Sequence, residues 1–149
     1  MSIETVLAEG RLIRNKWSKT APDGRQLLCL YTAMMDDPKA RPASCPADKA
    51  PRWIAELLPW MDDAGTEAAW EPMVRRVAAI APKLGQLQGE RSERLRSRCL
   101  ARVLRFVLPH AGSSGAAVNG VLALCDRHGA GGNVSPAAWA AAGAAAAGA

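Results

Sequence analysis

The chain has 149 residues, 49% of them hydrophobic, and a formal net charge of +5 at pH 7. A chain of this length buries about two-thirds of its unfolded surface on folding, enough for a core without disulfides or metals. Only 5% of the residues are aromatic, which argues against extensive sheet. Glu4 and Glu9 stand where a secretory signal needs a basic start and an apolar run, and no stretch has the apolar length of a membrane span. We therefore expect a cytoplasmic protein with no membrane role.

The first third of the chain predicts two helices. Apolar residues at helical spacing over residues 3–17 predict a helix that bends near Gly10 and is capped by Ser2. A turn with the sequence PDG follows. After it, residues 25–35, RQLLCLYTAMM, again carry apolar side chains at helical spacing, which predicts the second helix.

The middle of the chain predicts a loop and two more helices. The three prolines of residues 36–49 forbid regular structure, and we expect Cys45 to fold back under the next helix. Residues 51–61 predict a short amphipathic helix that one proline starts and another disturbs near its end. The turn DDAGT then caps a helix whose apolar residues from Trp70 to Leu84 share one face. Between these helices we expect a hydrophobic centre of Trp53, Trp60 and Trp70, with Trp17 nearby.

The last third predicts three helices separated by glycine-rich breaks. Residues 92–108 form the clearest amphipathic helix, and residues 116–128 form the next. Ser135 is a helix cap and Pro136 suits the first turn, so an Ala-rich helix begins there. Trp139 is the only large side chain of this last helix, and we expect it to anchor the tail on this chain or on another.

Together these elements predict an all-α fold, a compact single-domain bundle of six or seven short helices with a Pro-rich loop and no strand. We expect residues 1–134 to form the bundle, and residues 135–149 to form a helix that packs on it or on a partner chain. The cysteines are widely spaced with no CxxC pair, so we expect free thiols buried in helix faces. They are Cys29, Cys45, Cys99 and Cys125.

Positive charge is concentrated in the helix predicted at residues 92–108. At about 100° per residue, five arginines fall within an arc of about 80°, and apolar residues take the opposite side. Residues 91–105 hold six Arg and one Glu, an excess equal to the net charge of the whole chain. We call the five arginines the Arg ridge and predict that they form a binding surface: Arg91, Arg94, Arg98, Arg102 and Arg105.

Three interpretations of the Arg ridge are open. Its guanidinium groups match phosphate oxygens, so the ridge could contact a nucleic-acid backbone. It could equally contact an acidic patch on a protein. The third interpretation is a solvated helix face whose Arg stems cover neighbouring apolar surface. No exposed aromatic residues interleave with the ridge and no helix-turn-helix turn leads into it, which disfavours nucleic acid.

Two further sets of residues have spacings that allow metal chemistry. Cys125 and His128, at i and i+3, could supply two zinc ligands, and Cys99 with His110 could complete the set. The alternative is a core thiol beside a histidine at a helix C-terminus. The carboxylate pairs could hold magnesium or do acid–base work, although Asp in turns is common for capping alone. These pairs are Asp36 with Asp37 and Asp62 with Asp63.

No enzyme motif is recognisable in the sequence. Ser113 and Ser114, between glycines, lack the strand–turn–helix setting of a nucleophile elbow, and residues 129–133, GAGGN, lack the Lys and Ser/Thr of a phosphate loop. We interpret both segments as linkers. The expectation is therefore a protein that is not an enzyme and has no cofactor.

A series of short motifs nevertheless indicates a family. In order they are GRLIRNKW, DGRQLLCLYTA, CPADKAPRW, PWMDDAG, AWEPMVRRVA and an Ala-rich tail containing Trp. This order, over residues 10–139, resembles that of a group of small helical proteins of bacteriophages and prophages of Proteobacteria. The tail is shorter than the Ala-rich repeats of that group. The resemblance carries over no site residue.

The resemblance implies a class of function. Small helical phage proteins without enzyme motifs commonly act by binding, and one recurrent use is inhibition of a host defence complex, including anti-CRISPR activity. The expected function is a non-enzymatic binding protein that inhibits or modulates a bacterial protein or nucleoprotein complex in the host cytoplasm. The alternatives are a small basic DNA- or RNA-binding regulator that uses the Arg ridge, and a hydrolase. Homodimerisation through the C-terminal helix is also open.

Overall fold

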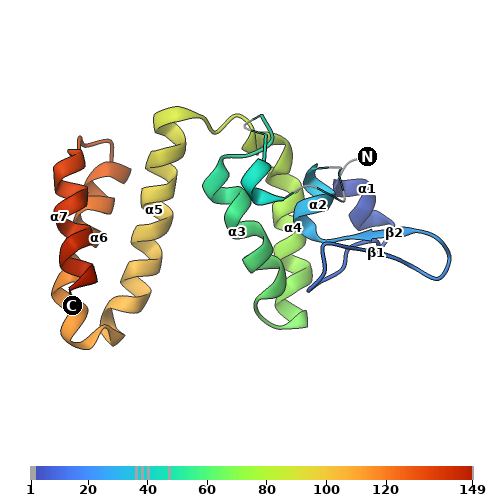
Figure 1. Ribbon diagram of the computed structural model, residues 1–149, viewed down its shortest axis with the longest axis horizontal. Coiled ribbons are helices and arrows are strands. Elements are labelled where there is room, and N and C mark those ends of the chain that lie inside the picture. The colour runs from blue at the N-terminus through green and yellow to red at the C-terminus, as the bar shows by residue number, and fades with distance from the viewer. Residues whose placement is uncertain (1–2, 36, 38, 40, 47, 149) are drawn as a thin grey trace. The chain divides into compact units, whose positions relative to one another are not determined.

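A computed structural model describes the chain in two compact units, Met1–Gln88 and Gly89–Ala149 (Figure 1). Helices dominate both units, which confirms the predicted all-α class. The division falls after Gln88, so the boundary predicted between residues 134 and 135 lies inside the second unit. The residues described are 3–35, 37, 39, 41–46 and 48–148.

Among its described residues, the first unit combines four α-helices with a small hairpin. Helices α1 and α2 pack on α4, and α2 also packs on α3. The elements, in chain order, are α1 (Ile3–Ala8), β1 (Ser18–Thr20), β2 (Gln26–Leu28), α2 (Leu30–Met35), a 3-10 turn (Pro42–Ser44), α3 (Arg52–Asp63) and α4 (Glu67–Leu84).

Helix α1 is much shorter than the helix predicted over residues 3–17. It ends at Ala8, and Gly10 has a φ of 63°, a left-handed conformation that glycine adopts readily. Beyond this point the backbone bonds to β2 instead, since the Ile13 N–H donates to the Leu28 carbonyl at 2.9 Å. The predicted cap, Ser2, lies outside the described residues.

The second predicted helix is wrong in its first half, where the chain forms a strand. β1 pairs antiparallel with β2, with Ser18 opposite Leu28 and Thr20 opposite Gln26. The predicted PDG turn closes this hairpin, and Gly24 supplies the positive φ of 84°. Helix therefore begins only at Leu30. The prediction that the chain has no strand is corrected accordingly.

Helices α3 and α4 form where the sequence predicted them. α3 continues through Pro59 to Asp63, and the predicted turn then leads into α4. Thr66 caps α4, because its hydroxyl accepts the Ala69 N–H at 3.3 Å. α4 passes through two prolines and ends at Leu84.

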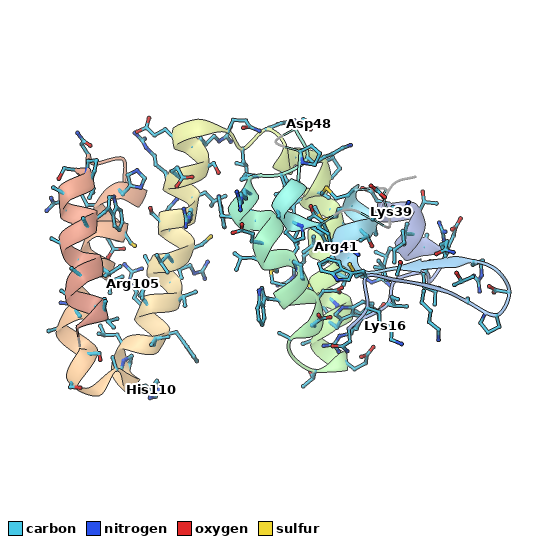
Figure 2. All side chains as sticks on the ribbon, in the orientation of Figure 1. Lys16, Lys39, Arg41, Asp48, Arg105 and His110 are labelled. Carbon is cyan, nitrogen blue, oxygen red and sulfur yellow. The ribbon has the colours of Figure 1, made fainter. Side chains whose placement is uncertain are left out.

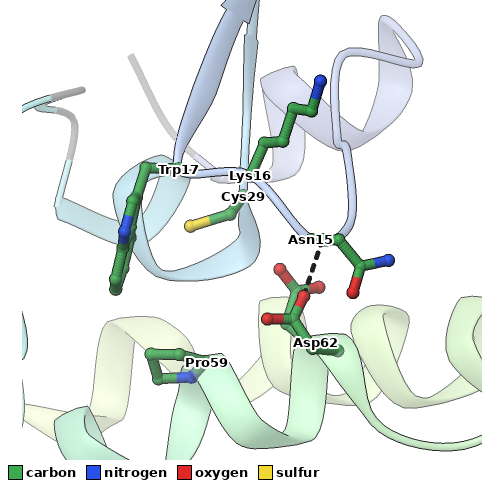
Figure 3. A pocket seen from close by; sticks show the side chains of 7 residues that line it. Asn15, Lys16, Trp17, Cys29, Pro59 and Asp62 are labelled. Carbon is green, nitrogen blue, oxygen red and sulfur yellow. Dashed lines mark hydrogen bonds between the residues drawn. The ribbon is translucent and has the colours of Figure 1, made fainter.

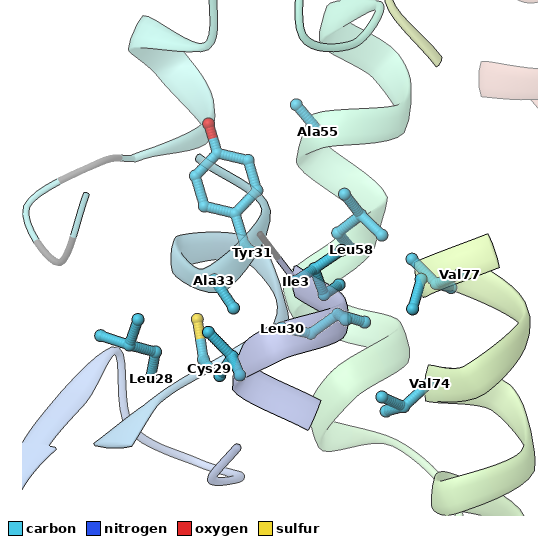
Figure 4. Close-up of a cluster of buried hydrophobic side chains, with 12 residues drawn as sticks. Ile3, Leu28, Cys29, Leu30, Tyr31, Ala33, Ala55, Leu58, Val74 and Val77 are labelled. Atoms are coloured by element: carbon cyan, nitrogen blue, oxygen red, sulfur yellow. The ribbon is translucent and has the colours of Figure 1, made fainter. Parts of the chain in front are cut away.

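The core of the first unit is centred on α2, not on tryptophan (Figure 4). Tyr31 and Leu30 are fully buried between α1, α3 and α4. Trp60, expected at the centre, is 77% exposed, because the face of α3 that packs inward holds the smaller Ala55 and Leu58. Trp70 and Trp17 are half-buried at the edge of this core, and Trp53 is also half-buried.

The Pro-rich segment of residues 36–49 has no α-helix or strand among its described residues. It contains the 3-10 turn Pro42–Ser44, which Pro42 starts. The Tyr31 hydroxyl donates to the Arg41 carbonyl at 3.0 Å and ties the segment to the core. Cys45 is half-buried and packs against the core of this unit.

The second unit is a stack of three helices in which α5 packs on α6 and α6 packs on α7. Its small core contains Ala101, Leu122 and Cys125, and Trp139 packs against it. The Ala-rich helix begins as predicted, with the Ser135 hydroxyl accepting the Ala138 N–H at 3.2 Å. The elements are α5 (Gly89–Val107), 3-10 turns at Leu108–His110 and Gly112–Ser114, α6 (Gly115–Gly129) and α7 (Pro136–Ala147).

Trp139 attaches α7 to the helix stack of its own chain. We expect Trp139→Ala to lower the free energy of unfolding of the second unit by about 2–4 kcal/mol, because α7 has no other large side chain to bury. Thermal denaturation followed by circular dichroism measures this, with Ala141→Gly on an exposed position of the same helix as a control for helix propensity. Equal losses of unfolding free energy in Trp139→Ala and Ala141→Gly would contradict the anchoring role of Trp139.

Candidate functional site

Helix α6 covers one face of α5 and thereby decides which side chains of α5 are exposed. Ser97 and Ala101 are buried on this face, and Leu104 packs against the same cluster. These small residues allow close approach of the two helices. At Gly129 of α6, an added Cβ would lie only 2.6 Å from Cγ of Arg98, so the two helices meet closely there. Several side chains on the other sides of α5 are exposed.

An apolar stripe runs along the side of α5 away from this face. Phe106 is 79% exposed and Val103 is 56% exposed. The expectation that Cys99 is buried is wrong, because α6 packs on the face of Ser97 and Ala101 instead. The spacing of four, three and one places the stripe on one side of the helix. We define the apolar stripe as Cys99, Val103, Phe106 and Val107, all of them exposed.

The Arg ridge lies between this stripe and α6. Two of its members are held by carboxylates: Arg94 by Glu90 at 2.5 Å, and Arg105 by Asp126 of α6 at 2.6 Å. Arg105 is labelled on α5 in Figure 2. The other three, Arg91, Arg98 and Arg102, are exposed and form no ion pair within the described chain. The structure thus brings the predicted ridge together on one helix and leaves three of its charges available.

The four candidate zinc ligands do not form a site. Cys125 is fully buried in the core of the second unit, whereas Cys99 is exposed on the apolar stripe. Burial raises the pKa of the Cys125 thiol and so disfavours the thiolate that zinc requires. His128 hydrogen-bonds to Ser97, and His110 lies in the 3-10 turn after α5. Within the described residues, no three His, Cys, Asp or Glu side chains cluster as metal ligands do.

Asp62 and Asp63 line a small cavity of about 130 Å³ in the first unit (Figure 3). The two oxygens of Asp62 accept the Leu30 N–H at 3.0 Å and the Trp70 indole N–H at 2.8 Å. Asp63 accepts the Asn15 N–H at 2.7 Å, drawn as the dashed line in Figure 3. Both carboxylates therefore hold the fold together. The cavity is lined by Asn15, Lys16, Trp17, Cys29, Pro59, Asp62 and Asp63.

Arg14 completes this structural network from a position that the sequence did not single out. Its guanidinium donates to the Asp62 carbonyl at 3.0 Å and to the carbonyls of the next residues at the C-terminus of α3. It also forms an ion pair with Glu67 at 3.1 Å. Because a cation is favoured at a helix C-terminus, Arg14 stabilises the α3–α4 turn.

The buried Asp62 carboxyl predicts a pH dependence of stability. Burial raises its pKa above the ordinary value of 3.8, although the bonds from Trp70 and Leu30 oppose the shift. The folded chain therefore binds more protons here than the unfolded chain, and the associated stability is lost as the pH rises through the raised pKa. We expect the advantage of the wild type over Asp62→Asn to shrink as the pH rises above 3.8. Urea denaturation at a series of pH values would contradict this if the advantage grew.

The remaining candidates occupy connecting segments. Asp37 accepts the Lys39 N–H at 2.8 Å in an exposed turn, and its neighbour Asp36 lies outside the described residues. Ser113 and Ser114 lie in the 3-10 turn Gly112–Ser114 before α6. Residues 129–133 join α6 to α7. These positions agree with the interpretation of both glycine-rich segments as linkers.

One pair with potential chemistry was missed in the sequence. The Ser97 hydroxyl and His128 Nδ1 lie 2.7 Å apart, joining α5 to α6. The residues are 31 positions apart, so no local spacing could reveal the pair. A hydrolytic site would also need a group that orients the histidine, and within the described chain no carboxylate hydrogen-bonds to His128.

Comparisons with protein-family models, curated proteins and solved structures find no match to this chain. Across the described residues, none of the helices combines the length and apolar character needed to cross a bilayer.

Proposed function

We propose that this protein is a non-enzymatic binding protein that docks an acidic protein partner on α5. The observation that carries the proposal is the apolar stripe beside the Arg ridge on a single helix. A contiguous exposed patch that includes Phe106 and Val103 is typical of an interaction surface. Arginine and aromatic residues are also the side chains that most often dominate binding energy.

The two parts of α5 define the chemistry of the partner. Apolar side chains of a partner helix or strand would pack on Phe106 and Val103, while its carboxylates would lie beside Arg98 and Arg102. Carboxylates already occupy this kind of position within the chain, since Asp126 pairs with Arg105. An antiparallel pair of copies would bring two Arg ridges beside each other, so like charges disfavour self-association by that route.

The biological setting that we propose is a bacterial host cell infected by a phage. The resemblance of the sequence motifs to a group of phage and prophage proteins supports this setting. The partner would then be an acidic subunit of a host complex in the cytoplasm, and docking would inhibit or modulate that complex, as anti-CRISPR proteins do. Neither catalysis nor a cofactor is needed for this action.

A nucleic-acid partner is the second candidate, and the three ridge arginines that form no ion pair among the described residues favour it. They could neutralise backbone phosphates and release counterions. A duplex bound to the Arg ridge would, however, leave Phe106 and Val103 exposed to water. The acidic protein accounts for both features of α5.

A defined probe tests the apolar part of the proposal. The probe is a synthetic amphipathic helical peptide with leucines along one side and glutamates beside them, titrated by calorimetry. We expect Phe106→Ala to weaken its binding by about tenfold or more, as expected for truncation of a buried interface anchor. The control is Ile80→Ala, which removes an exposed apolar side chain from α4 and should leave the affinity unchanged. Absence of peptide binding, or equal losses in both variants, would contradict the proposal.

A further inference from the structure

A second candidate site lies in the second unit, where α5, α6 and α7 border a cavity of about 350 Å³. This volume is within the range of small-molecule pockets. The site is separate from the apolar stripe and the Arg ridge. It is lined by Glu93, Arg96, Ser97, Leu100, His128 and Trp139.

One wall of the cavity is held in place by contacts between the three helices. Ser97 of α5 is buried and hydrogen-bonds to His128 of α6 at 2.7 Å. The His128 ring meets the Trp139 ring of α7 edge-on, with centroids 6.2 Å apart. Trp139 and Leu100 give the cavity an apolar lining that is already formed without a ligand.

Opposite charges stand one helical turn apart among the lining residues. Arg96 Nη1 and Glu93 Oε2 form an ion pair at 3.6 Å, a separation too long for a direct hydrogen bond, and both side chains are more than half exposed. Each group therefore keeps its hydrogen-bonding capacity for a third molecule. A simple anion would be repelled by Glu93, and a simple cation by Arg96. A molecule that carries a negative and a positive charge a few ångströms apart can pair with Arg96 and with Glu93 at the same time.

We propose that this cavity binds a free α-amino acid with an apolar side chain. The carboxylate binds the Arg96 guanidinium, the ammonium group binds Glu93, and the side chain packs against Leu100 and Trp139. Charge-assisted hydrogen bonds at both ends give specificity for the zwitterion. The inference goes beyond the docking role of α5 and does not depend on it.

Calorimetric titration with L-leucine tests this site, with N-acetyl-L-leucine and L-leucinamide as probes that each lack one charge. We expect L-leucine to bind about tenfold more tightly than either derivative, since each loses one charge-assisted hydrogen bond. Arg96→Gln and Glu93→Gln should each weaken L-leucine binding by about the same factor. Arg76→Gln, an exposed position of α4 outside the cavity, should have no effect.

Three results would overturn the proposal. The first is an affinity for N-acetyl-L-leucine equal to that for L-leucine, which would indicate a site for apolar carboxylates. The second is unchanged L-leucine binding in both variants, and the third is no binding of any probe. Because Arg96 and Glu93 are exposed, circular dichroism of the variants should match that of the wild type, so a loss of binding cannot be ascribed to misfolding. If L-leucine does not bind the cavity, binding of the acidic peptide to the apolar stripe should still be observed.

Discussion

Replacement of Asp62 by alanine should lower the free energy of unfolding of the first unit by about 2–5 kcal/mol. The side chain is 1% exposed and accepts two hydrogen bonds, from the Leu30 N–H at the start of α2 and from the Trp70 indole in α4. Its loss would leave both donors without an acceptor inside the fold. Asp62 therefore links its own helix, α3, to the next helix, α4, and to α2, whose Leu30 lies 32 residues earlier in the sequence.

Two matched variants separate this role from a general loss of charge. Asp62→Asn keeps one acceptor oxygen and should fall between the wild type and Asp62→Ala. Asp63→Ala removes the neighbouring carboxylate, whose single bond to the Asn15 N–H is exposed, and should cost about 1 kcal/mol or less. Urea denaturation followed by circular dichroism provides all three values. If Asp63→Ala lowered the free energy of unfolding as much as Asp62→Ala, the structural role given to the Asp62 hydrogen bonds would be contradicted.

The elements that the sequence predicted best are those with local chemical signals. Ser135 before Pro136 specifies both a cap and a first turn, and the structure has both. Thr66 caps α4 through its own hydroxyl, three residues from the N–H that it accepts. Such signals act within one helical turn, so tertiary contacts do not alter them.

The hairpin could not be predicted in this way. Leu27, Leu28, Leu30 and Tyr31 form a short apolar run whose spacing suits a helix as well as a buried strand. Hydrogen bonds to other segments favour the strand, because the Leu28 N–H donates to the Arg11 carbonyl and β1 pairs with β2. The exposure of Trp60 was missed for a related reason: a helical projection shows an apolar side but not how much of it other helices cover.

The same limit of a helical projection explains why the exposed apolar stripe of α5 was not predicted. The projection correctly grouped the five arginines, yet it could not show that α6 would pack on the side of Ser97, Ala101 and Leu104. The signal was present as small residues four apart, which allow close helix packing. Because the larger apolar residues were interpreted as the buried side, packing of α6 on the small residues was not predicted. The exposed stripe, and with it the candidate site, became visible only in the structure.

Reversal of charge at the centre of the Arg ridge should have the largest effect on binding. We expect Arg98→Glu combined with Arg102→Glu to weaken binding of the acidic amphipathic peptide by about a hundredfold, because attraction becomes repulsion at two adjacent positions. Both side chains are exposed and form no ion pair within the described chain, so the fold should persist. The matched control is Arg76→Glu with Lys83→Glu on α4, which changes the net charge equally and should have little effect.

The central claim is that α5 docks an acidic protein surface, and titration of this double variant and the wild type with two probes tests it most directly. The probes are the acidic amphipathic peptide and a DNA duplex of arbitrary sequence. We expect the wild type to bind the peptide more tightly than the duplex, and the double variant to lose its affinity for the peptide. A wild type that prefers the duplex, with an affinity that falls linearly in a log–log salt plot with a slope reporting about three phosphates, would contradict it in favour of nucleic acid. A double variant that binds the peptide as tightly as the wild type would show that the Arg ridge is only a solvated helix face.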